Sequence, residues 1–332
     1  MKLAVLGDIH LFTLDVHPRR LLSKRVFAHT NLLMNRRHRF NHALLPALVD
    51  KAKSLSPDMV LFSGDVSTSS LEREFEDLLE VVAPLVEDDP AGAGIPGVLV
   101  PGNHDRYTFR SRRVKRIETI LQKVMPTEFP HVRELRPGWR LLALDSAIPN
   151  RMFSRGALGK AQFRGAVEAI RAVPEGEALL VLCHYPCTLP PRVPSAWSHD
   201  LKEAEALRRE LTACRGRVVY MHGHIHKPWH VLPPAPAPGI ASENSSGKYN
   251  GKDPAKSSFT GGPAFECLNA GSPCMTSDKY PLGQGFWEVD LPEDPLAPLA
   301  TTHHVPARTT GTEGLTLAAA SREVDWIAGP GV

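Results

Sequence analysis

The amino-acid sequence predicts an α/β fold in which most strands of the sheet run parallel. Three features of its 332 residues lead to this prediction. Short apolar runs alternate with segments whose apolar residues recur at helical spacing, which is typical of βαβ units. The runs are continuous rather than alternating, as in strands buried on both faces. Polar turns, several of them with glycine, end the runs.

The first half of the chain contains three expected strands and two expected helices. The strands are Lys2–Leu6, Met59–Ser63 and Gly97–Val100. The helices are Phe40–Leu55 and Leu71–Val86, and the apolar residues of the second fall on one helical face. Ser69 and Glu72 are expected to form a capping box at its start.

The second half continues this pattern. The expected strands are Arg140–Leu144, Ala178–Leu182 and Val218–Met221, followed by Glu266–Asn269 and Gly285–Asp290. The expected helices are Lys160–Val173 and a segment marked by Leu201, Ala204, Leu207 and Leu211.

One domain is expected to span residues 1–292. It would carry a basic helical insert at 17–42 and a mobile loop, rich in Pro, Gly and Ser, at 233–263. Residues 293–332 are expected to form a loop-like tail with one short helix near Leu315–Ile327. A chain of this length can bury a core without metal staples, so bound metals would serve chemistry.

Composition predicts a cytoplasmic protein. Five cysteines, an odd number, do not indicate a disulfide framework. The apolar part of the N-terminus is too short for a signal peptide, and no apolar run approaches about 18 residues. The net charge of +3 says little about partners.

Potential metal ligands follow successive apolar runs. In an open α/β sheet the carboxyl ends of the strands form one edge, so these side chains are expected to converge there. Carboxylate, carboxamide and imidazole donors suit divalent ions, with Mn first and Fe, Zn or Ni as alternatives. Seven donors fit two ions if the Asp65 carboxylate bridges them. The expected ligands are Asp8, His10, Asp65, Asn103, His184, His224 and His226.

Five short motifs occur in order between residues 8 and 226. They are Asp8-Ile9-His10, Gly64-Asp65, Gly102-Asn103-His104-Asp105, His184 and Gly223-His224-Ile225-His226. This set resembles the motifs of the calcineurin-like metallophosphoesterases. The resemblance implies a four-layer sandwich of two facing mixed β-sheets flanked by helices. It also implies a binuclear hydrolase in which a metal-bridging hydroxide attacks phosphorus in line.

The resemblance further implies roles for individual residues. One ion would be held by Asp8, His10, Asp65 and His226, and the other by Asp65, Asn103, His184 and His224. His104 would act at the leaving-group oxygen as a proton donor or transition-state stabiliser. Asp105 would assist catalysis by orienting His104.

Basic residues supply candidate substrate contacts. Arg36 and Arg37 lie in a stretch without acidic residues that could form a basic amphipathic helix, either on an anionic membrane surface or merely solvated. Arg106 and His222, each beside a motif, are further candidates, although a packing role is favoured for His222. The lack of interleaved aromatic residues argues against nucleic acid, and no feature indicates a protein partner.

The expected substrate is a small anionic phosphate compound, and its identity is left open. The chain is similar to bacterial cyclic-nucleotide phosphodiesterases of the superfamily. The segment from His222 to His230 is similar to the UDP-diacylglucosamine pyrophosphatases of lipid A synthesis, whose substrate would suit an insert at the inner membrane face. A catalytically silent protein-binding scaffold is the alternative of another class.

Overall fold

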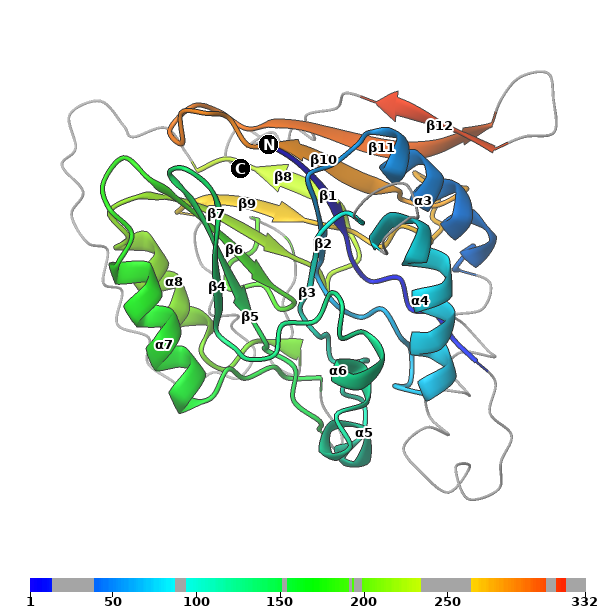
Figure 1. Cartoon of the computed structure of the whole chain (residues 1–332), viewed down its shortest axis with the longest axis horizontal. Coiled ribbons are helices and arrows are strands. Elements are labelled where there is room, and N and C mark those ends of the chain that lie inside the picture. Colours follow the sequence, from blue (N-terminus) through cyan, green and yellow to red (C-terminus); the bar gives the residue numbers. More distant parts are fainter. Residues whose placement is uncertain are drawn as a thin grey trace, which may run out of the picture.

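Two six-stranded β-sheets face each other, and helices cover the outer side of each (Figure 1). The computed structural model describes residues 1–13, 39–86, 94–150, 154–190, 193, 199–233, 264–308 and 315–320. The α/β class and the four-layer sandwich that the resemblance implies are therefore confirmed.

The first sheet has the strand order β12-β11-β10-β1-β2-β3. Its parallel half pairs β1 with β2 and β2 with β3, while β10, β11 and β12 are antiparallel to their neighbours. The strands are β1 (Lys2–Leu6), β2 (Met59–Phe62), β3 (Gly97–Leu99), β10 (Phe286–Asp290), β11 (Ala300–Arg308) and β12 (Leu315–Ala320).

The second sheet has the order β4-β5-β6-β7-β9-β8. Its four central strands are parallel, and β4 and β8 close its edges in the antiparallel sense. The strands are β4 (His131–Arg136), β5 (Trp139–Leu144), β6 (Ala178–Cys183), β7 (Arg217–His222), β8 (Trp229–Val231) and β9 (Glu266–Asn269).

Four longer helices form the two outer layers. Residues of α3 (Leu45–Ser54) and α4 (Glu72–Val86) pack on the first sheet, and residues of α7 (Lys160–Arg171) and α8 (Ala204–Thr212) pack on the second. Three short elements are η2 (His42–Leu44), α5 (Phe109–Arg113) and α6 (Arg116–Ile120). No described helix is long and apolar enough to cross a membrane.

Three apolar layers explain the continuous runs in the sequence. Along β1, Leu3 and Val5 point into the layer between the sheets, whereas Ala4 and Leu6 point into the layer beneath α3 and α4. Successive side chains of a strand face opposite sides, so a strand covered on both sides is apolar throughout. A third layer lies between the second sheet and its helices.

The structure corrects several sequence-based expectations. A single largely parallel sheet is wrong, because each sheet has a parallel part and antiparallel strands beside it. The loop-like tail is also wrong where the structure describes it, since β11 and β12 extend the first sheet and the start of the expected helix Leu315–Ile327 is a strand. Residues 309–314 and 321–332 lie outside the described residues. The cap of α4 uses Glu74 rather than Glu72: its carboxylate accepts hydrogen bonds from Ser69 N and Leu71 N, each at 3.0 Å.

Some expectations concern residues that the structure does not describe. Most of the basic insert 17–42 and of the loop 233–263 fall in the ranges 14–38 and 234–263, outside the described residues. The domain boundary at residue 292 stays a prediction.

Candidate metal centre

The turns that follow β1, β2, β3, β6 and β7 bring the seven expected ligands together. Four of them form a first donor cluster, in which the ligand atoms of Asp8, His10, Asp65 and His226 all lie within 4.8 Å of one another. Within this cluster His226 Nε2 lies 3.3 Å from Asp8 Oδ1 and 2.9 Å from His10 Nε2.

A second donor cluster lies on the other side of Asp65. The ligand atoms of Asp65, His184 and His224 also lie within 4.8 Å of one another. Asn103 joins this cluster, because its Oδ1 is 3.2 Å from His184 Nε2. Both clusters combine hard oxygen with imidazole nitrogen, a donor set suited to divalent transition metals.

Asp65 is the residue that the two clusters share. Its Oδ2 lies 3.7 Å from His10 Nε2 and 3.4 Å from His184 Nε2. Burial alone would raise the pKa of Asp65, but the charges of His184, His104 and His10 hold it well below its usual range. A carboxylate that is ionised and buried between two groups of donors is the arrangement a bridging ligand needs.

His184 shows that the site favours positive charge. Burial would lower its pKa, yet the neighbouring Asp65 carboxylate raises it to about 9. In the protein alone, an imidazolium proton compensates Asp65. Divalent cations would supply that compensation directly, so the residues present fit a metal centre.

The histidine rings are oriented by backbone carbonyl groups. His184 Nδ1 donates to Ser63 O at 2.8 Å, which directs Nε2 toward Asp65 and Asn103. His224 Nε2 donates to His199 O at 3.0 Å. A carbonyl accepts only, so each contact assigns the proton to one ring nitrogen and leaves the other with a lone pair in the neutral form.

The backbone at these positions is strained. Five of the seven expected ligands have a φ between 49° and 71°, a region that non-glycine residues rarely adopt. Such strain persists only where surrounding contacts hold it, and it concentrates at functional sites. These five residues are Asp8, His10, Asp65, His224 and His226.

Two glycines allow the close approach of the loops. Gly64 has a φ of +94°, and a Cβ there would lie 2.6 Å from Gly102 N. A Cβ on Gly102 would collide with the Asp65 carboxylate. The absence of a side chain at Gly102 therefore leaves the space that the Asp65 carboxylate occupies.

His104 lies beside the first donor cluster. Its ring packs edge-on against His10, with centroids 4.8 Å apart, and its backbone N donates to Asp65 Oδ1 at 2.7 Å. Its Nδ1 donates to Thr68 O at 2.6 Å. The side chain is half-buried, in contrast to the buried ring of His10.

Asp105 connects the turn after β2 to the turn after β3. Its buried carboxylate accepts hydrogen bonds from Ser67 N, Ser67 Oγ and Gly102 N, each at 2.9 Å. Burial and the charge of Asp65 raise its pKa to about 7. The expectation that Asp105 orients the His104 ring is corrected: Thr68 O holds that ring, and Asp105 positions the turns on either side of it.

Two of the candidate substrate contacts are buried. Arg106 is buried, and its guanidinium binds Asp145 Oδ2 at 2.7 Å and Glu118 Oε1 at 2.8 Å. His222 is 0% exposed and donates from Nδ1 to Gly223 O. Burial lowers the pKa of His222 to about 3, so the ring is a neutral part of the core. Arg36 and Arg37 lie outside the described residues.

Sequence reasoning missed the partners of these residues. Asp145 comes directly after β5, and Asp8 comes two residues after β1. The position of Asp145 therefore indicated a polar side chain at the edge of the sheets where the expected ligands lie. Ser67 and Thr68 follow Asp65 and bind Asp105 and His10 O. Their hydroxyl groups gave no signal, because serine and threonine are common in any turn.

Comparison with known proteins identifies the family. The profile of the calcineurin-like phosphoesterases matches residues 1–228, so the chain belongs to this family. A Synechococcus protein described as "Probable cyclic nucleotide phosphodiesterase" is 29% identical over 109 residues. That match covers 33% of this chain and 36% of the relative, so it spans about a third of the curated protein.

One solved structure shows the same fold, and another is similar over a smaller part of its own length. A dimetal phosphatase from Danio rerio superposes with a TM-score of 0.52 at 13% identity, covering 88% of this chain and 93% of that one. A purple acid phosphatase from yellow lupin gives a TM-score of 0.47 at 14% identity over 70% of this chain and 39% of that one.

Proposed function

We propose that this chain is a binuclear metal-dependent phosphodiesterase acting on a small diester. The observation that carries the proposal is the pair of donor clusters that share Asp65. One ion would be held by Asp8, His10, Asp65 and His226, and the other by Asp65, Asn103, His184 and His224. Two such ions would lower the pKa of a water and neutralise the phosphoryl oxygens.

The protein residues would position the substrate and handle a proton. Hydrolysis forms a bond from a water oxygen to phosphorus and breaks the bond to the leaving oxygen, which then takes up a proton. His104 Nδ1 is committed to Thr68 O. Its Nε2 is therefore the ring atom that would deliver the proton to the leaving oxygen.

The diester class is favoured by the match to the Synechococcus protein, whose description names a cyclic nucleotide. The lipid A alternative depends on membrane contact by Arg36 and Arg37, which lie outside the described residues. It stays a prediction, and loss of vesicle binding on charge reversal of these two arginines would support it. Manganese and a cytoplasmic location are likewise proposals, the second resting on five unpaired cysteines.

A substrate panel run with several metals tests the proposal. The wild-type chain, stripped and reloaded with Mn, Fe or Zn, is assayed on a cyclic nucleotide, bis(4-nitrophenyl) phosphate and a UDP-linked acylated sugar. We expect diester hydrolysis that a chelator abolishes, with Mn the most effective. Full metal loading without hydrolysis of any compound would overturn the proposal and favour a scaffold.

A further inference from the structure

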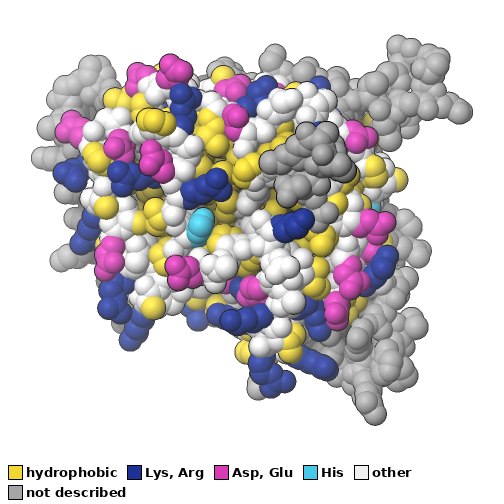
Figure 2. Space-filling view, in the orientation of Figure 1, with side chains coloured by type: hydrophobic (Ala, Val, Ile, Leu, Met, Phe, Trp, Pro, Cys, Tyr) yellow, Lys and Arg dark blue, Asp and Glu magenta, His cyan; other side chains and the backbone are white. Residues whose placement is uncertain are grey.

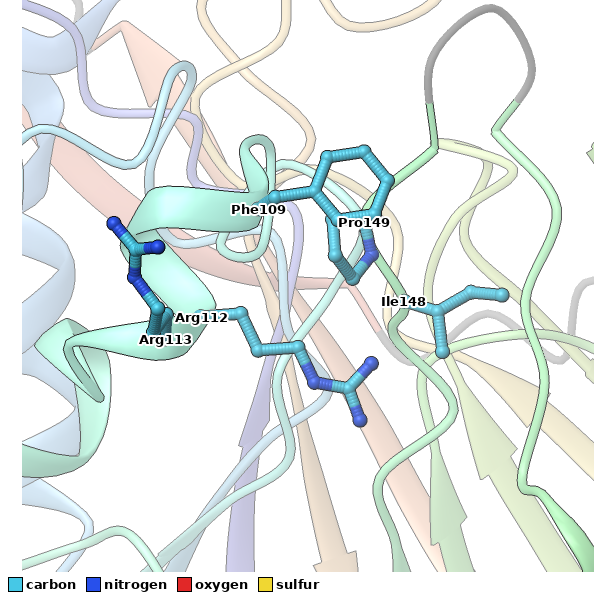
Figure 3. A pocket seen from close by; sticks show the side chains of 5 residues that line it. All are labelled: Phe109, Arg112, Arg113, Ile148 and Pro149. Carbon is cyan, nitrogen blue, oxygen red and sulfur yellow. The ribbon is translucent and has the colours of Figure 1, made fainter.

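A cleft of about 580 Å³ opens beside helix α5. Its lining comes from two segments, α5 and the loop that follows β5 (Figure 3). In Figure 3 the side chains of Phe109 and Arg112 extend from α5 toward the loop that carries Ile148 and Pro149. Among the described residues, the lining is Phe109, Arg112, Arg113, Ile148 and Pro149.

The cleft stands at the same edge of the fold as the donor clusters. Its two walls follow the carboxyl ends of β3 and β5, and the ligands follow those of β1, β2, β3, β6 and β7. The His104 ring stacks on Tyr107, with centroids 5.6 Å apart, and α5 begins two residues later. Five peptide units limit the distance from His104 Cα to Phe109 Cα to about 18 Å.

A buried ion pair fixes the two walls relative to each other. Arg106 leaves the His104 loop and binds Asp145, three residues before Ile148. Glu118 on α6 binds the same guanidinium and ties it to the helix after α5. The cleft is therefore held between packed elements, although its lining is open to solvent.

The lining combines an aromatic face with positive charge. Phe109 is 60% exposed, and Arg112 and Arg113 are exposed on the same short helix. Lys and Arg side chains gather at the lower edge of the molecule, over α5 (Figure 2). A ligand with a flat apolar ring and a negative charge could stack on the aromatic face and pair with the arginines.

We propose that this cleft binds the leaving group of the substrate, and that the leaving group carries a flat ring and a second negative charge. The inference rests on the proposed phosphodiesterase function. The leaving side is assigned because His104, the proton donor expected at the leaving oxygen, is continuous with the α5 wall. Arg112 and Phe109 would then determine specificity.

Two matched substrates isolate the second charge. Methyl 4-nitrophenyl phosphate and methyl 3-carboxy-4-nitrophenyl phosphate share the reacting diester and the aromatic ring, and differ by one carboxylate on the leaving group. We expect kcat/KM of the wild-type enzyme to be about fivefold higher for the carboxylated substrate, through a lower KM. The reason is that one exposed charge pair strengthens binding by up to about fivefold. Arg112→Ala should bring this ratio to about one, Arg112→Lys should keep part of it, and Arg113→Ala should have a smaller effect.

Arg164→Ala is the matched control. Arg164 is an exposed arginine of α7, outside the cleft and the donor clusters, so its loss removes the same charge elsewhere. This variant should keep the wild-type ratio and both rates. A wild-type ratio near one, or a ratio that survives in Arg112→Ala, would overturn the subsite.

Binding to the metal-free protein gives a readout that needs no turnover. The leaving phenol, 5-hydroxy-2-nitrobenzoate, should bind with a dissociation constant on the order of 1 mM. Phe109→Ala and Arg112→Ala should each weaken that binding about fivefold or more. Equal binding by wild type and both variants would contradict the subsite. If wild type instead hydrolyses neither diester with any metal, the proposed function fails, an outcome distinct from lost discrimination between two working substrates.

Discussion

The donor clusters around Asp65 and the cleft beside α5 are built in opposite ways. Asp8 and Asp65 are 0% and 1% exposed and sit at positive φ, held by hydrogen bonds from neighbouring turns. Phe109 is 60% exposed and lies in an ordinary helical turn. Both regions follow strand ends at the same edge of the fold.

This difference teaches which parts of the molecule tolerate change. A strained, buried site persists only because many contacts determine it, and so each member is hard to replace. An exposed cleft on a short helix carries few such constraints. We infer that the clusters carry the chemistry and that the cleft carries selectivity, and the following variants test this division.

The largest effect is expected from Asp65→Ala. Removal of the shared carboxylate should lower kcat/KM for bis(4-nitrophenyl) phosphate by at least about 10³-fold, because both ions lose a ligand. The rates are measured after reloading with Mn. Asp50→Ala removes an exposed carboxylate from α3 and should leave the rate unchanged. Near-normal turnover in Asp65→Ala would contradict the assignment of the chemistry to the donor clusters.

His104→Ala should cost about 10²-fold in kcat while metal content stays at the wild-type level. The reason is that His104 lies beside the donor clusters and not among their atoms. The loss should grow as the pKa of the leaving alcohol rises, since a poor leaving group needs the proton more. Loss of a metal ion from this variant would show that His104 is a ligand instead.

Arg106 connects the two regions, and Arg106→Met should destabilise the fold by about 2 kcal/mol. The substitution leaves the partly buried Asp145 and Glu118 without their partner. The expected loss of stability is smaller than for a fully buried ion pair, because both acids retain some exposure. Urea unfolding measures the change. The pair of exposed Arg73 and half-buried Asp77 is the control, and Arg73→Ala should change stability by less than about 0.5 kcal/mol.

A pH effect on stability sharpens the contrast between two buried histidines. Beside Asp65, the pKa of His184 is raised; on β11, burial and the nearby His304 lower the pKa of His303 to about 3. An unfolded histidine protonates near pH 6.5. The unfolded chain therefore binds a proton at His303 that the folded protein does not bind. The free energy of unfolding consequently falls as the pH drops from about 6.5 toward 3.

His303→Gln should remove about 1 kcal/mol of the stability that wild type loses between pH 7 and pH 5.5. The comparison uses denaturant midpoints of the metal-free proteins at both pH values. An unchanged pH dependence in His303→Gln would show that the folded ring is protonated as readily as the unfolded one.

Much of the fold could be predicted because its strands are buried on both faces. The expected bounds of Lys2–Leu6 and Glu266–Asn269 agree with β1 and β9. Strands β11 and β12 were missed for physical reasons. The first contains His303, His304 and Pro306, so it has no apolar run. The second ends in three alanines, whose helical preference is overridden by pairing with β11.

The convergence of the seven expected ligands could be predicted because each follows an apolar run. Burial could not be read from the sequence, and so Arg106 was expected to contact substrate and His222 was kept as a candidate beside its favoured packing role. The cleft as a cavity could not be predicted, because it depends on the proximity of helix α5, which follows β3, and the loop after β5, about forty residues apart in the chain. Only the tertiary structure brings Phe109 and Pro149 to one cavity.

Anomalous diffraction from crystals of the Mn-loaded protein tests the shared-carboxylate centre most directly. Two peaks are predicted, one among Asp8, His10, Asp65 and His226 and one among Asp65, Asn103, His184 and His224. Both should lie within coordinating distance of the Asp65 carboxylate. A single peak, or two peaks of which one lies away from Asp65, would contradict the account.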